Sequence, residues 1–229
     1  MPFDPTPDEI ADRWVDARDR IREFMAGVGG GELSRNVPGT PKWSVIELMG
    51  HVVGSPIDLA NGNFEAAGSP EWTQAQVEAR RGRSIAELLE EWDGAVGEIV
   101  TKIRAGQIPA PVAYDVITHE QDLRGALGLD VLPDAKGLTF MTDGFAARLE
   151  RVVEKAELPP LQLIDPDAGW TAGPTGGVTL TGTQFEFFRG MTGRRSDAQV
   201  AALDWSADPA PYLPLLSVFG DLPELDVHD

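Results

Sequence analysis

Apolar residues recur at helical spacing in the first part of the chain. In residues 8–29, the apolar positions 10, 14, 17, 21 and 24 fall on one face, which is the pattern of an amphipathic helix. The glycines at 29–31 are expected to end this helix. Further helical segments are expected at 43–54, 84–106 and 109–128. Four such helices predict a bundle.

The ends of these segments carry signals of their own. Ser44 and Glu47 begin the second segment, and Ser84 and Glu87 begin the third, both with the S-x-x-E spacing of a capping box. The fourth segment opens with prolines and closes at Gly128, as is common at the two ends of a helix.

Pro56 follows the second segment closely. Proline removes a backbone hydrogen bond and clashes with the carbonyl four residues earlier, here that of Val52, so the helix should kink or end near "GSP". We favour an end, although a kink would shape a pocket beside His51.

Residues 68–82 could hold a short helix. Trp14 and Trp43 are expected to anchor packing at helix starts.

The pattern changes after Gly128. Residues 127–137 have the composition of a linker, and a helix is expected at about 138–156. Two short β-like runs, "LQLID" and "GVTLTG", are separated by a turn rich in glycine and proline, and helical pieces close the chain. We therefore predict a mainly α protein, with a four-helix bundle over residues 1–130 and a small α+β domain over residues 131–229.

Charge and cysteine content limit the possible functions. The formal net charge of −18 argues against binding to nucleic acid or to an anionic membrane surface. The sequence has no cysteine, which excludes disulfides and cysteine nucleophiles within the chain. We see no signal-peptide pattern and no apolar run long enough to span a membrane, so we expect a cytoplasmic protein.

Histidines provide the candidate chemistry. Asp115 and His119 are four residues apart on the fourth predicted helix, so their side chains share one face, with about 5–6 Å between Cβ atoms. His51 is flanked by apolar residues in "LMGHVVG", where a buried polar group needs a partner. If His51 faces the other two across the bundle, the three could bind one metal ion and leave positions open for water or substrate. A D-x-x-x-H pair alone is more often a surface pair or a hydrogen-bonded histidine than a ligand pair. The remaining histidine, His228, is expected to belong to the tail.

Three segments resemble a known family. "WSVIELMGHVVG", "DVITHEQDLRGALG" and "FRGMTGRRSDAQVAALDW" are similar to segments of the mycothiol-dependent maleylpyruvate isomerase-like proteins, within the DinB-like superfamily. The resemblance covers nearly the whole chain. It implies a four-helix bundle with a divalent metal, usually zinc, in its core, and a small C-terminal domain.

The resemblance also implies a site and a cofactor. The implied metal ligands are His51, Asp115 and His119. The characterised isomerase has glutamate where this chain has Asp115, so the carboxylate here is one methylene shorter. Asp122 is a second carboxylate three residues after His119, and we expect it to bond Arg124 or a helix end. Family members use mycothiol, a low-molecular-weight thiol, as cofactor or co-substrate.

A chain without cysteine would take such a thiol from outside, and a metal would hold it as the nucleophilic thiolate. The thiolate would add to a maleyl-type double bond in an isomerase, or displace a leaving group or open an epoxide in a transferase. An arginine would orient a carboxylate substrate by a bidentate contact. The candidates are Arg189, Arg194 and Arg195, of which we select Arg194 and Arg189. A basic helix end favoured by the helix dipole explains the same residues equally well.

Three functions remain in view. The first is a metal- and thiol-dependent isomerase or S-transferase with a small-molecule substrate and a low-molecular-weight thiol as its partners. The second is a metal-dependent hydrolase on the same fold, with Asp115 or Glu120 as proton acceptor. The third is a non-catalytic ligand-binding protein that has lost the metal.

Overall fold

The structure, a computed structural model, describes residues 3–130 and 135–228. The chain divides into two compact units. One consists of Pro5–Val131, and the other combines Leu132–His228 with Met1–Asp4. Within the second unit, the ring of Phe3 meets that of Phe140 edge to face, with 5.4 Å between centroids.

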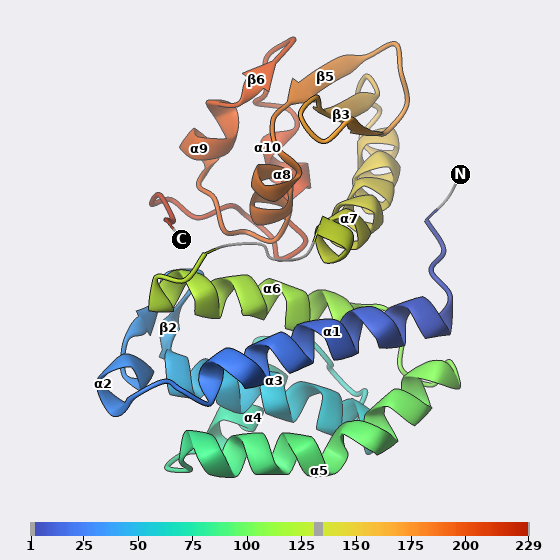
Figure 1. The fold of residues 1–229 in the computed structure, drawn as a ribbon. Coiled ribbons are helices and arrows are strands. Elements are labelled where there is room, and N and C mark those ends of the chain that lie inside the picture. The colour runs from blue at the N-terminus through green and yellow to red at the C-terminus, as the bar shows by residue number, and fades with distance from the viewer. Residues whose placement is uncertain (1–2, 131–134, 229) are drawn as a thin grey trace. The chain divides into compact units, whose positions relative to one another are not determined.

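The first unit is a bundle of four long helices (Figure 1). These are α1 (Pro7–Met25), α3 (Val45–Ala60), α5 (Ile85–Arg104) and α6 (Pro111–Leu127). Each packs against two others in the order α1, α6, α3, α5. The connections carry the short elements α2 (Gly30–Leu33), β1 (Asn36–Val37), β2 (Thr40–Ser44) and α4 (Pro70–Ala79). The predicted bundle and the short helix within residues 68–82 are confirmed.

Both predicted capping boxes are present. The Glu47 carboxylate accepts a hydrogen bond from the Ser44 backbone N–H at 2.9 Å, at the start of α3. At the start of α5, the Ser84 hydroxyl accepts from the Glu87 N–H, and the Glu87 carboxylate accepts from the Ser84 N–H at 2.8 Å. These bonds satisfy backbone donors that a helix N-terminus leaves without a partner.

Pro56 does not end its helix. The second predicted helix continues as α3 through Pro56 to Ala60, so our expectation of an end near "GSP" is wrong. Pro56 itself is buried, as are the ten other core residues of α3. Tertiary packing of this apolar helix compensates for the backbone bond that proline removes.

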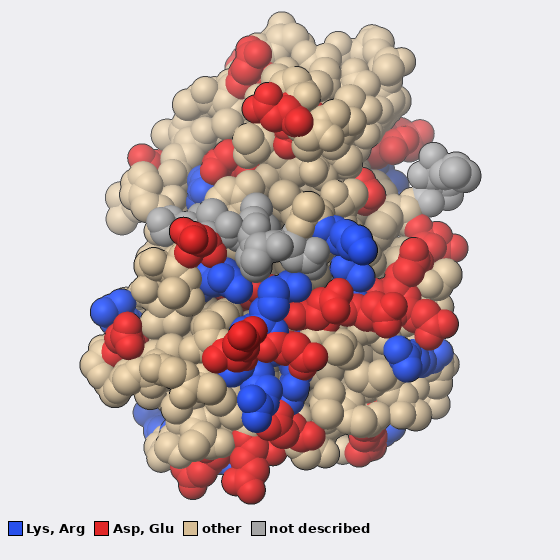
Figure 2. All heavy atoms as spheres, in the orientation of Figure 1, with Lys and Arg blue, Asp and Glu red and all other residues tan. Residues whose placement is uncertain are grey.

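Large side chains fill the bundle core. Trp14 of α1 and Trp92 of α5 are fully buried and meet edge to face, with 6.1 Å between ring centroids. This confirms the packing role expected of Trp14. At the surface, Asp93 of α5 pairs with both Arg18 and Arg22 of α1. Figure 2 shows acidic and basic side chains interleaved over these two helices.

The second unit combines helices with a four-stranded sheet. Its helices are α7 (Ala135–Lys155), α8 (Gln184–Met191), α9 (Asp197–Ala201) and α10 (Leu213–Leu216). Its strands are β3 (Leu161–Asp165), β4 (Trp170–Ala172), β5 (Val178–Thr181) and β6 (Asp204–Trp205), in the spatial order β4-β3-β5-β6. The two predicted β runs are β3 and β5, which pair in parallel. The edge strands β4 and β6 were not predicted.

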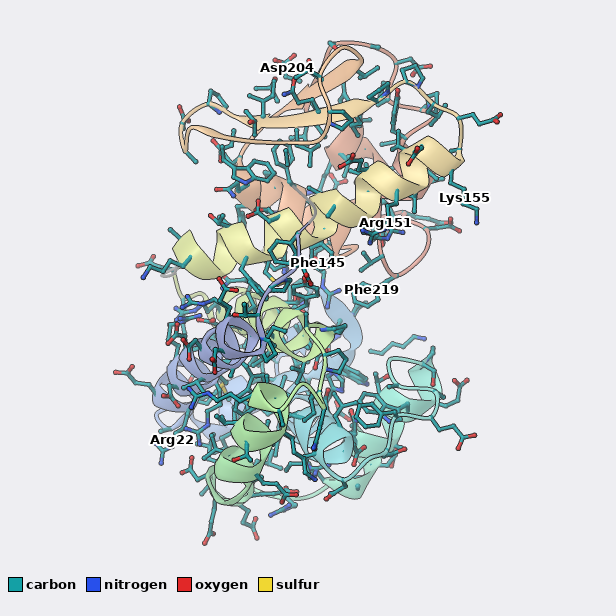
Figure 3. All side chains as sticks on the ribbon, turned by 90° about the vertical axis from the view of Figure 1, so that its right-hand side faces the viewer. Arg22, Phe145, Arg151, Lys155, Asp204 and Phe219 are labelled. Atoms are coloured by element: carbon teal, nitrogen blue, oxygen red, sulfur yellow. The ribbon has the colours of Figure 1, made fainter. Side chains whose placement is uncertain are left out.

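Helix α7 shows how this unit separates its faces. Phe145 and Leu149 are buried, whereas Arg151 and Lys155 are exposed. Figure 3 labels Phe145, Arg151 and Lys155 along this helix. No helix in the described part of the chain is long and apolar enough to cross a membrane.

Candidate metal centre

Helices α3 and α6 bring three predicted residues together in the bundle unit. His51 comes from α3, while Asp115 and His119 lie one turn apart on α6, which packs against α3. Among the described residues, these three form the one group of histidine and carboxylate side chains placed to hold a metal ion. Their candidate ligand atoms all lie within 4.8 Å of one another.

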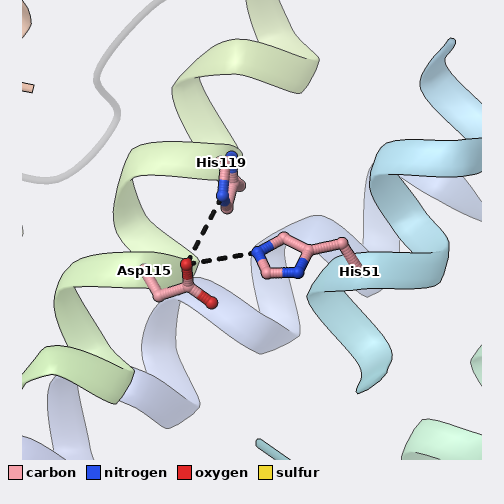
Figure 4. A group of neighbouring side chains, drawn as sticks. All are labelled: His51, Asp115 and His119. Carbon is pink, nitrogen blue, oxygen red and sulfur yellow. Dashed lines mark hydrogen bonds and ion pairs between the residues drawn. The ribbon is translucent and has the colours of Figure 1, made fainter. Parts of the chain in front are cut away.

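The Asp115 carboxylate lies between the two imidazoles (Figure 4). Its Oδ1 atom is 3.4 Å from Nε2 of His51 and 3.4 Å from Nε2 of His119. Two ligands bound at 2.0–2.1 Å in a tetrahedral zinc site are roughly 3.3 Å apart. The shorter side chain of aspartate therefore reaches the position that a shared metal requires.

The cluster is closed on the histidine side. The side chains of His51 and His119 are 3% and 9% exposed, whereas that of Asp115 is 29% exposed. Trp43 of β2 covers part of His51, with 5.3 Å between the ring centroids and a tilted arrangement. An incoming ligand therefore reaches the cluster most easily beside Asp115.

Hydrogen bonds at the far nitrogens define the tautomers of the two histidines. Nδ1 of His51 lies 2.6 Å from Oε1 of Gln76, and Nδ1 of His119 lies 2.9 Å from Oδ2 of Asp122. Both partners are oxygen acceptors, so both Nδ1 atoms carry the proton in neutral imidazole. Each Nε2 atom then presents a lone pair toward Asp115.

This donor set fits a divalent metal ion. Two imidazole lone pairs and one carboxylate oxygen converge, and such electron-rich atoms repel one another unless a cation or a proton lies between them. Imidazole and carboxylate are zinc ligands, and histidine ligands commonly donate their other N–H to an oxygen, as both do here. Because three protein ligands leave a tetrahedral position open, the arrangement suits a catalytic site better than a closed structural one.

Without a metal, the neighbouring carboxylates favour a proton on His119. Burial lowers the pKa of His119, but the Asp115 and Asp122 carboxylates outweigh that effect, and the pKa lies above its ordinary value of 6.5. Burial raises the pKa of Asp115, but the two histidines outweigh it and hold the pKa well below its ordinary value of 3.8. Both shifts favour the charged pair of imidazolium and carboxylate.

Asp122 is buried, and its Oδ2 atom bonds Nδ1 of His119, a contact that we did not expect. The expected bond between Asp122 and Arg124 is wrong. Arg124 instead donates to Oε1 of Glu120, and Arg20 of α1 donates to both oxygens of Glu120 at 2.8 and 2.7 Å. Both oxygens of the Glu120 carboxylate therefore accept hydrogen bonds from arginines, and its role as the proton acceptor of a hydrolase stays a prediction.

The predicted arginines lie in the second unit. Arg189 is fully buried on α8, with its guanidinium 5.7 Å from the ring centroid of Phe188. Arg194 is also buried, and it donates to the Thr192 carbonyl at 2.5 Å. Arg195 binds the Glu186 carboxylate through two hydrogen bonds of 2.7 and 2.9 Å. The substrate-binding role of Arg189 and Arg194 stays a prediction.

Sequence reasoning missed two residues behind the cluster. Gln76 lies on α4 and bonds His51, and its amide nitrogen donates to Oδ2 of Asp58 at 3.0 Å. The spacing of 25 residues between His51 and Gln76 carries no periodic signal. Asp58 lies on the same face of the helix as His51 and Ser55. This shared face was the only sequence signal that pointed to Asp58. His228 is exposed near the C-terminus, as expected.

The fold and the cluster define a class: helical bundles with two histidines and one carboxylate converging in the core, followed by a small α+β unit. Residues 14–115 match the family described as the mycothiol maleylpyruvate isomerase N-terminal domain. The matched segment lies within the bundle, and it confirms the resemblance to this family that is seen in the sequence. The match includes His51 and ends at Asp115, four residues before His119.

Solved structures share the fold of this chain over 96% of its length. A crystal structure of the mycothiol-dependent maleylpyruvate isomerase is 15% identical, covers 96% of each chain and has a TM-score of 0.56. A histidine-to-alanine mutant of that isomerase is 14% identical, with the same coverage and TM-score. At these identities the likeness establishes the fold. No curated protein matches the chain.

Proposed function

We propose that the protein is a metal- and mycothiol-dependent isomerase or S-transferase that acts on a small organic substrate. The convergence of the two Nε2 atoms on Oδ1 of Asp115 carries this proposal. The family match supports the thiol, because its description names mycothiol and maleylpyruvate isomerase.

A divalent metal, which we propose is zinc, lowers the pKa of a coordinated thiol when bound and favours the thiolate at neutral pH. The chain has no cysteine, so the thiol comes from a separate molecule. His51, Asp115 and His119 would hold the metal. The thiol would approach beside Asp115, because its side chain is 29% exposed whereas the two imidazoles are buried.

A thiol that loses its proton binds the metal as an anionic thiolate. The two positive charges of a divalent ion would then offset the charges of Asp115 and of the thiolate. We propose that Arg194 and Arg189 orient a carboxylate of the substrate, because guanidinium groups bind carboxylates through two parallel hydrogen bonds.

Metal content is the first test. We would measure zinc by elemental analysis in the wild-type protein and in His119→Ala, each purified without chelator and re-equilibrated with zinc. We expect about one equivalent in the wild type and loss of the metal in the variant. A wild-type protein without zinc after this treatment would overturn the proposal and favour a ligand-binding protein without metal.

Thiol dependence is the second test. The zinc-loaded protein would be incubated with maleylpyruvate, with and without mycothiol, and isomerisation followed by absorbance. Turnover only with the thiol supports an isomerase. S-conjugation of an electrophile without isomerisation would support the transferase. Thiol-independent hydrolysis would instead support the alternative function, a hydrolase with Asp115 or Glu120 as proton acceptor.

A further inference from the structure

We infer that Gln76, held in place by Asp58, is a positioning residue that sets the tautomer of His51 and so presents its Nε2 atom to the metal. This inference rests on the proposed function, because it takes the cluster to be a metal site. Gln76 acts through His51 and is placed by a helix outside the four-helix bundle.

The Gln76 amide has one orientation available. A carboxylate oxygen only accepts hydrogen bonds, so the amide nitrogen must face Oδ2 of Asp58, 3.0 Å away. The amide oxygen then faces Nδ1 of His51 at 2.6 Å. Gln76 is 1% exposed and its bond to His51 is buried, so water does not compete for that bond. Asp58 therefore determines, through the amide, which nitrogen of His51 carries the proton.

A reversed amide would block the site. If the amide nitrogen faced His51, Nδ1 would have to accept and the proton would move to Nε2. The protonated Nε2 has no lone pair for a metal and would donate to Asp115 instead. The Asp58 carboxylate excludes this arrangement.

The two histidines are supported in different ways. His119 bonds Asp122 on its own helix, so one turn of α6 fixes both residues. His51 depends on a neutral amide from α4, a separate helix. The geometry of His51 is therefore sensitive to how α4 packs on α3.

Glycines of α3 allow α4 to approach closely. A Cβ atom on Gly54 would lie 2.8 Å from Cβ of Gln76 and 2.5 Å from Nη1 of Arg80. A Cβ atom on Gly50 would lie 3.5 Å from Cβ of Arg80. Arg80 then binds the Glu91 carboxylate of α5 through bonds of 3.1 and 2.7 Å, which fixes the end of α4.

The direct test reads the tautomer in the full-length wild-type protein. Long-range ¹H–¹⁵N correlation spectra of the metal-free protein, at a pH where the imidazoles are neutral, show which ring nitrogen carries the proton. We expect Nδ1–H at His51. A proton on Nε2 of His51 would overturn the inference whether or not the protein binds zinc.

Substitutions then link the tautomer to zinc. Gln76→Leu removes the acceptor and should weaken zinc binding about 10–100-fold, as for other residues that support metal ligands. Gln74→Leu is the matched control on the same helix, because Gln74 bonds Trp43 and Glu78 instead. It should leave zinc affinity unchanged. Affinity would be measured by competition with a chromogenic chelator.

A charge-preserving exchange distinguishes positioning from packing. In the double variant Gln76→Glu with Asp58→Asn, the asparagine amide donates to the new carboxylate, which again accepts from His51. We expect it to recover most of the affinity lost in Gln76→Leu and to restore the visible spectrum of the cobalt-substituted protein. No recovery, or wild-type affinity in Gln76→Leu, would contradict the inference. If the wild-type protein binds no zinc at all, the proposed function fails. The tautomer spectra alone then decide whether Gln76 sets the tautomer of His51.

Discussion

Two carboxylates of α6 act on the same histidine from opposite sides. Asp115 faces Nε2 of His119, and Asp122 faces Nδ1. In the proposed site, Asp115 shares the metal with His119, whereas Asp122 makes the imidazole more basic and fixes its orientation. These different positions predict different consequences of substitution.

Asp122→Asn should weaken zinc binding about 10–100-fold without abolishing it, because the ligand set stays complete. The same change removes a negative charge beside His119, so the pKa of His119 in the metal-free protein should fall. Zinc competition and NMR titration of the C2 proton would measure both effects. An unchanged pKa would show that Asp122 does not act on His119 as we describe.

The pH dependence of zinc binding follows from the same residue. The pKa of His119 is raised above 6.5, so protons compete with zinc at a higher pH than for an ordinary histidine. Affinity should be constant above this pKa and fall by up to about tenfold per pH unit below it. Competition titrations across this range would test the slope. A flat profile would mean that His119 is not a ligand.

The stability of the metal-free protein should fall as pH rises through the pKa of His119, whereas its zinc affinity should rise. The raised pKa of His119 adds stability that is fully present below the histidine pKa of the unfolded chain and is lost as pH rises through the folded pKa. The depressed pKa of Asp115 adds stability that is lost only in strong acid. The difference in melting temperature between zinc-loaded and metal-free protein should therefore widen as pH rises.

At the scale of elements, the close packing of α4 on α3 depends on Gly54, and this packing positions Gln76 next to His51. Gly54→Ala would place a methyl group against Gln76 and Arg80, where overpacking typically costs about 1–3 kcal/mol. We expect lower stability in urea together with weaker zinc binding, because α4 carries Gln76 away from His51.

Gly94→Ala on α5 is the matched control. An added Cβ atom there meets nothing within 4 Å. Alanine in a helix interior is favoured over glycine by about 0.5–1 kcal/mol, so this variant should be more stable and bind zinc as the wild type does. Equal destabilisation in both variants would contradict the close-packing explanation for Gly54.

Local signals predicted most of the helices and three site residues, but not what supports them. Asp115 and His119 share a helical face by spacing, so their proximity follows from secondary structure. Gln76 reaches His51 only because two glycines let α4 approach α3, and this tertiary contact leaves no periodic pattern in the sequence. Tertiary packing also explains why the helix did not end at Pro56 as we expected, because burial of α3 outweighs the loss of one backbone hydrogen bond.

At the scale of the whole molecule, the three candidate metal ligands, together with Gln76 and Asp58, fall within Pro5–Val131. We therefore predict that a fragment of residues 5–130 folds and binds one equivalent of zinc with wild-type affinity. Circular dichroism and zinc competition would test this prediction. The fragment should lack thiol-dependent turnover if Arg189 and Arg194 hold the substrate.

A fragment that folds but binds zinc poorly would mean that the second unit contributes to the site. A fragment that does not fold would contradict the proposed domain boundary after residue 130. Full activity in a folded fragment would instead remove Arg189 and Arg194 from the mechanism.

The position of Trp43 has a practical consequence. Its indole ring lies 5.3 Å from the His51 imidazole, and its Nε1 atom donates to Gln74. Arrival of a divalent charge beside His51 changes the electric field at the indole, so the intrinsic fluorescence of the protein should report occupancy of the site without a label. Trp43→Phe should abolish that optical response while zinc still binds, and the emission of the other tryptophans would remain as an internal reference.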